Sequence, residues 1–182
     1  MKRVLPLLLM PTAALAHPGH AGHVSPFAAG WAHPLGGTDH VLAMVAVGLW
    51  AATARDPRGI WALPLAFVGA MVAGGALGAA GIALPAVEPM ILASSIILGL
   101  AVALALRPSL TFALPAVALF GLMHGHAHGA EGPASGLVAY AAGFVLATTA
   151  LHLAGIGLGR LGASRFLGAA TTAAGVALAV MP

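Results

Sequence analysis

The chain has 182 residues, of which 60% are hydrophobic and only 6% charged, and its mean hydropathy is +1.02. Soluble domains carry about a quarter charged residues, so this composition excludes an ordinary soluble fold and indicates an integral membrane protein. The net charge of +3 arises from too few charges to form a nucleic-acid-binding surface. Cysteine is absent, which excludes disulfides and thiolate metal sites and leaves nine histidines and four carboxylates as metal ligands.

Residues 1–16 have the layout of a secretory signal peptide. Two basic residues precede a short apolar run, and Ala14-Leu15-Ala16 forms a small-x-small cleavage site. We therefore expect cleavage after Ala16, with an uncleaved signal anchor as the alternative. The mature chain would then begin with an outer segment, residues 17–28, whose histidines are candidates for auxiliary metal binding: His17, His20 and His23.

Six apolar stretches follow, on the basis of about 20 residues for each crossing of a bilayer. The predicted fold class is all-α, an integral membrane bundle of six transmembrane helices that forms one domain, residues 29–182. The connections between the stretches are too short to contain an extramembrane domain. The predicted spans are roughly 29–53, 60–81, 88–106, 110–127, 134–157 and 164–181.

The arginines predict how these spans are oriented. If the mature N-terminus is outside, the first, third and fifth loops are cytoplasmic, and basic loops remain on that side. We therefore expect a bacterial cytoplasmic (inner) membrane protein with both mature termini on the periplasmic side. The two halves would cross in opposite directions, which suggests a 3+3 inverted repeat. All five arginines of the mature chain belong to the predicted inner loops: Arg55, Arg58, Arg107, Arg160 and Arg165.

The first span contains three ionisable groups within eight residues: His33, Asp39 and His40. Ionisable groups in a bilayer-spanning segment cost several kcal/mol unless they are paired, hydrated or metal-bound, so the cluster indicates a functional site. Pro34 and the two glycines after it favour a broken helix, which would shorten the separation of about 10 Å between His33 and His40 on a continuous helix. The alternative is a hydrogen-bonded network that only fixes helix packing.

A second cluster lies at the outer end of the fourth span. His124, His128 and Glu131 have the spacing i, i+4, i+7 and share one helix face. His126 points elsewhere if the helix is continuous, and is an auxiliary candidate. Both clusters belong to the outer half of the membrane, so we expect them to meet in one metal site; a hydrated loop is the alternative for the second. The expected core is Asp39, His40, His124 and His128, with His33 and Glu131 close to it.

Two further groups are candidates for supporting roles. Glu88 lies at the outer mouth of the third span, where a carboxylate either suits the helix dipole or assists the metal site. His152 lies toward the cytoplasmic half of the fifth span, where it is either satisfied by a neighbouring hydroxyl or carbonyl group or part of an exit path.

The two clusters carry a resemblance. The run His33-x5-Asp39-His40, together with the run His124-Gly-His-Ala-His128-Gly-Ala-Glu131, resembles the motifs of the HupE/UreJ family of bacterial nickel permeases. The similarity extends over essentially the whole chain, except that Met123 stands where we expect a phenylalanine. The resemblance implies uptake of Ni²⁺, or Co²⁺, for the maturation of hydrogenase or urease. We therefore expect a permease rather than an enzyme, with the metal ion as cargo, the lipid bilayer as its surroundings and no prosthetic group.

Two other classes remain as alternatives. An intramembrane metal-dependent hydrolase would use the same histidines and carboxylates to hold an ion that activates water. An outward-facing metal-binding sensor is the other alternative, although the short predicted loops leave no cytoplasmic domain to which it could report. The sequence contains neither the His-Glu-x2-His motif of zinc proteases nor a Gly-x4-Gly-Lys-Ser/Thr nucleotide-binding loop.

Overall fold

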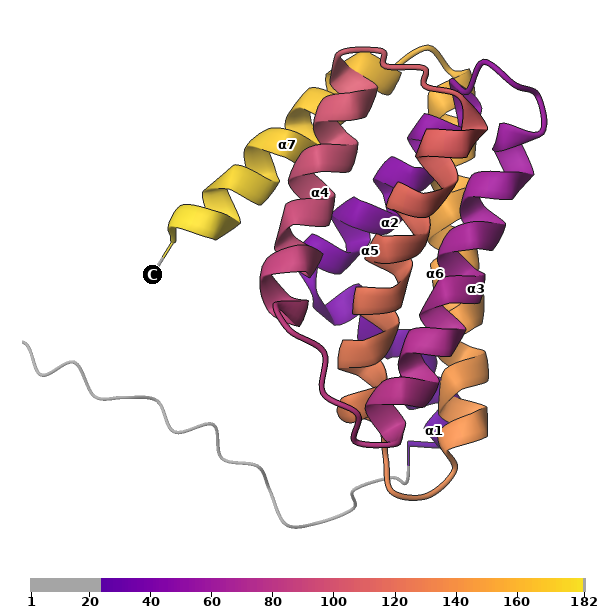
Figure 1. The fold of residues 1–182 in the computed structure, drawn as a ribbon, viewed down its shortest axis with the longest axis vertical. Helices are drawn as coiled ribbons and strands as arrows, with labels where there is room; N and C mark the ends of the chain where they lie inside the picture. Colours follow the sequence, from indigo (N-terminus) through magenta and orange to yellow (C-terminus); the bar gives the residue numbers. More distant parts are fainter. Residues whose placement is uncertain (1–23, 182) are drawn as a thin grey trace, which may run out of the picture.

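The computed structural model describes residues 24–181, so the predicted signal peptide and His17, His20 and His23 lie outside the described residues. The described part of the chain is all-helical, as predicted, and contains no strand (Figure 1). Its seven helices are α1 (Pro26–Gly36), α2 (Thr38–Ala52), α3 (Gly59–Ala79), α4 (Val87–Ala103), α5 (Leu110–Ala130), α6 (Leu137–Arg160) and α7 (Ser164–Val180).

Three of these helices, α3, α5 and α6, are long and apolar enough to cross a membrane, and α1 with α2 amounts to a fourth crossing if the bent pair is one span. Helices α4 and α7 are apolar but have only 17 residues each. The outer surface is apolar too, since Leu65, Phe112 and Val138 are 69%, 74% and 84% exposed. Such a surface suits contact with lipid. The count of six crossings and the inverted repeat stay predictions.

The first predicted span is broken, as the sequence suggests. Helix α1 ends at Gly36, α2 begins at Thr38, and the two helices are bent by 85°. Pro34 has no backbone N–H for the carbonyl of the preceding turn, and Gly37 is extended between the helices, with φ −104° and ψ 116°. The break places His33 and His40 on different helices.

Glycines bring α3 and α5 into direct backbone contact. A Cβ atom on Gly125 would lie only 1.9 Å from the carbonyl oxygen of Met71, and one on Gly129 only 2.0 Å from that of Gly75. Residue numbers increase together along the two helices, so α3 and α5 run parallel. Small residues allow this kind of close approach in membranes, and the contact fixes the position of α5, which carries the second histidine cluster.

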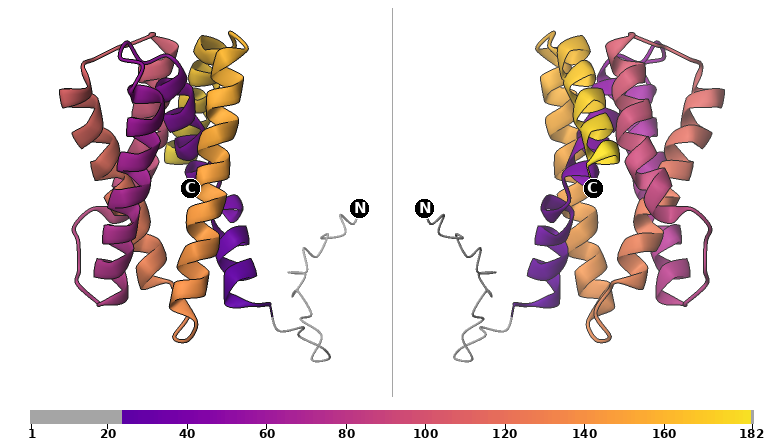
Figure 2. Two further views of the ribbon diagram at one scale, coloured as in Figure 1. Left: turned by 90° about the vertical axis from the view of Figure 1, so that its right-hand side faces the viewer. Right: turned by 90° about the vertical axis from the view of Figure 1, so that its left-hand side faces the viewer.

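The two ends of the bundle differ in charge. The connections after α2, α4 and α6, which carry or adjoin all the arginines of the described chain, lie at one end, here called the arginine end. The start of α1 lies at the other end, together with the connections after α3 and α5 (Figures 1 and 2). At the arginine end, Nη2 of Arg58 lies 2.8 Å from Oδ2 of Asp56, and this guanidinium holds the pKa of Asp56 below its usual value. The segregation of the arginines at one end agrees with the predicted topology; which end faces the cytoplasm stays a prediction.

Candidate metal centre

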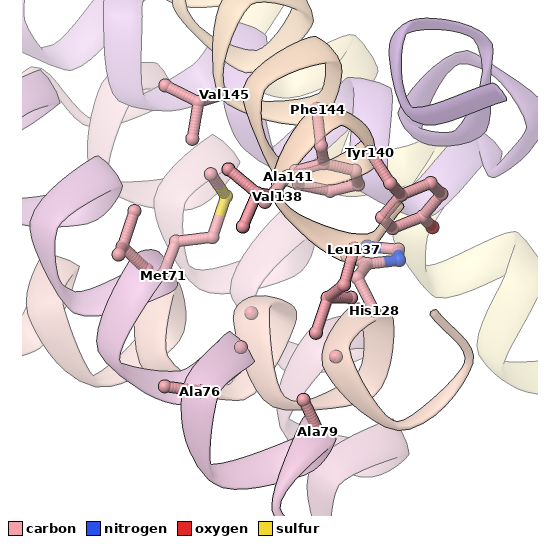
Figure 3. Close-up of a pocket in the computed structure, with 14 residues that line it drawn as sticks. Met71, Ala76, Ala79, His128, Leu137, Val138, Tyr140, Ala141, Phe144 and Val145 are labelled. Atoms are coloured by element: carbon pink, nitrogen blue, oxygen red, sulfur yellow. The ribbon is translucent and has the colours of Figure 1, made fainter. Parts of the chain in front are cut away.

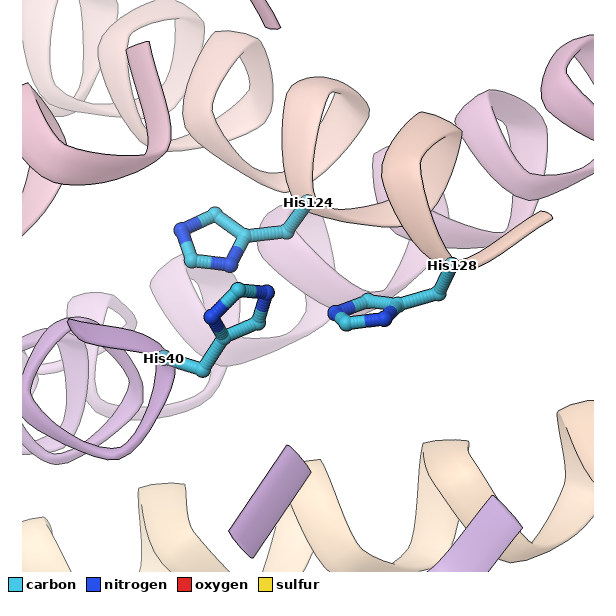
Figure 4. Close-up of side chains that lie close together, drawn as sticks. All are labelled: His40, His124 and His128. Carbon is cyan, nitrogen blue, oxygen red and sulfur yellow. The ribbon is translucent and has the colours of Figure 1, made fainter. Parts of the chain in front are cut away.

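Three imidazoles meet inside the bundle (Figure 4). His124 and His128 lie one turn apart on α5, and His40 approaches them from the first turn of α2, with its ring centroid 4.7 Å from that of His124 and 4.5 Å from that of His128. One nitrogen of each ring lies within 4.8 Å of the others. Nitrogens bound to one metal at about 2.1 Å are about 3.3 Å apart, so a small contraction would let this inner triad hold an ion.

Ser94 of α4 fixes the tautomer of His124. The Ser94 hydroxyl lies 2.5 Å from the carbonyl oxygen of Ile91 and donates to it, so it accepts from Nε2–H of His124 at 2.9 Å. His124 then presents its unprotonated Nδ1, which has no partner among the described residues. Hydrogen bonds of this kind decide which ring nitrogen is available to a metal. The sequence carries no signal that distinguishes Ser94 from its neighbour Ser95 in this role.

Asp39 orients His40 in a similar way. Its Oδ1 accepts hydrogen bonds from the backbone N–H and from ring Nδ1 of His40, both at 2.9 Å. His40 therefore presents Nε2, which is buried and has no partner within residues 24–181. The sequence suggests Asp39 as a core ligand. In the structure its carboxylate lies behind His40, and it belongs neither to the inner triad nor to the second group of ligands described next.

A second group of ligands shares His128. This outer triad consists of His33 of α1, His128 and Glu131 at the end of α5, with one ligand atom of each within 4.8 Å of the others. Nε2 of His33 lies 3.3 Å from Oε2 of Glu131, and these side chains are 35% and 58% exposed. A recess of about 450 Å³ is lined by the outer triad and also by His40. Both ring nitrogens of His128 are buried and unpartnered in the described chain, so they remain available to either triad.

The other predicted residues lie apart from the two triads. Glu88 is exposed in the first turn of α4 and lines a separate recess of about 580 Å³ together with Asp39. Nε2 of His126 lies 2.7 Å from the carbonyl oxygen of Ile82, so this ring ties α5 to the connection after α3 and points away from the triads, as predicted. His152 is 1% exposed and lies on α6.

An apolar groove reaches His128 from the side of the bundle (Figure 3). It has a volume of about 230 Å³ and lies between α3, α5 and α6, where Met71, Val138 and Phe144 line it with His128. The rings of His128 and Phe144 have centroids 4.1 Å apart. Because the lining is mostly aliphatic and aromatic carbon, the groove suits hydrocarbon better than an ion.

Comparison with known proteins places both triads within a region of family similarity. The profile of the family described as "HupE / UreJ protein" matches residues 5–182. "Protein HupE" of Rhizobium leguminosarum bv. viciae is 44% identical over 184 residues, which cover 97% of this chain and 95% of that protein. No solved structure has significant similarity to the chain. The resemblance seen in the two sequence motifs is therefore confirmed.

Proposed function

Because this chain belongs to the HupE/UreJ family, we propose that it is a permease that carries Ni²⁺, or Co²⁺, into a bacterial cell across the cytoplasmic membrane. The family is one of metal transporters that serve hydrogenase or urease, and not a class of enzymes. The observation that supports the proposal most strongly is the pair of three-ligand groups that share His128 inside an apolar bundle. Imidazole with one carboxylate is a ligand set that suits borderline divalent ions.

The two triads suggest an order of events. The outer triad is exposed and includes the carboxylate of Glu131, so it would attract a hydrated cation first. Rotation of the His128 ring would then bring the ion to His40 and His124, whose free nitrogens are already directed inward by hydrogen bonds. Each step replaces bound water by imidazole nitrogen, and His128 remains a ligand throughout.

The orientation of the bundle completes the proposal. If the arginine end faces the cytoplasm, as the positive-inside rule requires, both triads lie in the periplasmic half of the membrane. In this proposal the mature N- and C-termini belong to the periplasmic side, and the imported ion reaches hydrogenase or urease maturation proteins inside the cell.

The test is metal flux into proteoliposomes that contain the purified protein, with Ni²⁺, Co²⁺ and Zn²⁺ offered separately. We expect entry of Ni²⁺ or Co²⁺, abolished by His40→Ala and by His128→Ala. His126→Gln is the matched control on the same helix, because it keeps a donor for the Ile82 carbonyl and leaves both triads intact. Tight binding of metal without flux of any ion would instead support a sensing or catalytic role.

A further inference from the structure

His152 is a buried polar group that neither triad uses. It is 1% exposed, and neither of its ring nitrogens has a hydrogen-bond partner in the part of the chain that the structure describes. Buried polar groups in proteins nearly always have a partner. Neither Thr148, one turn earlier on α6, nor a backbone carbonyl fills that role here, so the ring is poised for a ligand from outside the chain.

A single aromatic side chain separates His152 from the inner triad. The ring of Phe67 lies 5.4 Å from that of His124 and 5.1 Å from that of His152, measured between centroids. His152 therefore lies across the Phe67 ring from His124. Helix α6 runs toward the arginine end (Figure 1), and His152 belongs to its second half, which places His152 on that side of the inner triad. A rotation of the Phe67 side chain would connect the two positions.

Two weaker ligand groups lie about one helical turn from His152, on the side of the inner triad. Thr148 lies one turn before His152 on α6, and its Oγ1 donates to Sδ of Met71 at 3.7 Å. Met71 lies one turn after Phe67 on α3, with its backbone against Gly125 of α5, so a hydroxyl and a thioether lie together between the level of His152 and that of the inner triad. The backbone here is held firmly, because a Cβ atom on Gly48 of α2 would lie 2.1 Å from the carbonyl oxygen of His152.

We propose that His152 is a further metal-binding position, which receives Ni²⁺ or Co²⁺ from the inner triad on the way to the arginine end. The proposal rests on the transport function proposed above and adds a step to it. Beyond His152 the core is apolar, with Leu49, Leu63 and Ile156 buried, so His152 is the last ionisable ligand within the described bundle before the arginine end.

The absence of cysteine from the chain offers a direct spectroscopic test. In His152→Cys a single thiolate replaces the imidazole, and Co²⁺ bound to it gives a sulfur-to-cobalt charge-transfer band that imidazole and carboxylate sites lack. We expect this band when purified His152→Cys protein is titrated with Co²⁺. Leu153→Cys is the matched control, since its neighbouring side chain is 48% exposed on the outer surface, and it should give no band.

Flux measurements with His152→Leu complete the test. If the ring has only a packing role, a leucine of similar bulk leaves flux unchanged. If His152 receives the ion, flux falls by at least about 10-fold, while Co²⁺ binding to the triads and elution as a folded protein stay as in the wild type. Wild-type flux in His152→Leu, or no thiolate band in His152→Cys protein that binds Co²⁺ at its triads, would overturn the proposal for His152. Absence of flux in the wild type would instead overturn the transport function.

Discussion

The inner and outer triads use the same histidine in opposite surroundings. In the inner triad three imidazoles are buried or nearly so, and the hydrogen bonds that two of them donate to Asp39 and Ser94 orient their rings. In the outer triad the side chains of His33 and Glu131 are 35% and 58% exposed and contact each other. If the proposed transport function holds, we expect the exposed, charged group to capture the ion and the oriented, buried group to select it. Because His128 belongs to both triads, we also expect that the two triads do not fill independently.

Removal of the shared ligand is the strongest test of this comparison. His128→Ala takes one ligand from each triad. Loss of a residue that only orients a metal ligand already lowers affinity or activity by up to about 100-fold, so we expect loss of this shared ligand to lower flux by at least that factor. Ni²⁺ binding, measured by calorimetry, should weaken at both steps of the titration. Retention of more than about a tenth of the flux would mean that the triads work without a common member.

Substitution of a ligand that belongs to only one triad should change the transport kinetics in a way that depends on the triad. Glu131→Gln removes the exposed negative charge, so we expect a KM raised about 10-fold with little change in maximal rate, and a smaller difference at high ionic strength because salt screens exposed charges. His40→Ala should instead abolish flux and lower the number of ions bound per protein, while the outer triad still binds metal. Identical kinetics in the two variants would break the distinction between the triads.

The orientation of His124 is expected to matter less than the ligand itself. Ser94→Ala removes the acceptor that holds Nε2–H, so Ni²⁺ affinity should fall about 10-fold. Nitrogen NMR of the His124 ring should change from one tautomer to a mixture. Ser95→Ala is the matched control, because the Ser95 hydroxyl donates only to the carbonyl of Leu92; an equal loss of affinity there would point to helix packing instead.

The smallest effect is expected at the break between α1 and α2. A Cβ atom on Gly37 would lie 2.9 Å from Nδ1 of His40 and 3.1 Å from Oδ1 of Asp39, whereas one on Gly36 would meet nothing within 4 Å. Gly37→Ala should therefore displace the His40 ring and weaken Ni²⁺ binding by a few-fold. Gly36→Ala should bind like the wild type, and a similar loss in both variants would contradict this account.

Much of this arrangement is predictable from local sequence rules. A proline followed by two glycines disrupts a helix wherever it occurs, which explains why the break at Gly37 could be expected. A spacing of four residues places His124 and His128 on one face of any continuous helix, and it also directs His126 elsewhere. The predicted positions of the two motifs in the same half of the membrane place them at the same depth, which is a condition for their meeting.

Details that depend on the angle between helices could not be predicted. The 85° bend decides that His33 joins Glu131 while His40 joins His124. The role of Asp39 depends on the backbone at the start of α2, which turns its carboxylate toward the ring of the next residue. Ser94 acquires its partner only because α4 packs beside α5, and a serine in an apolar helix usually bonds to its own backbone.

The backbone contact between α3 and α5 has a consequence for discrimination among ions. Carbonyl oxygens of α3 are set against Gly125 and Gly129, so we expect the backbone of α5 to hold the Cα atoms of His124 and His128 at a fixed separation while the His128 ring turns. We expect His40, which follows the break at Gly37, to be the more adjustable third ligand. Affinity in general rises toward copper across the divalent series, so we expect a site on so rigid a helix to rank ions by the bond angles they accept and not only by the strength with which they bind nitrogen.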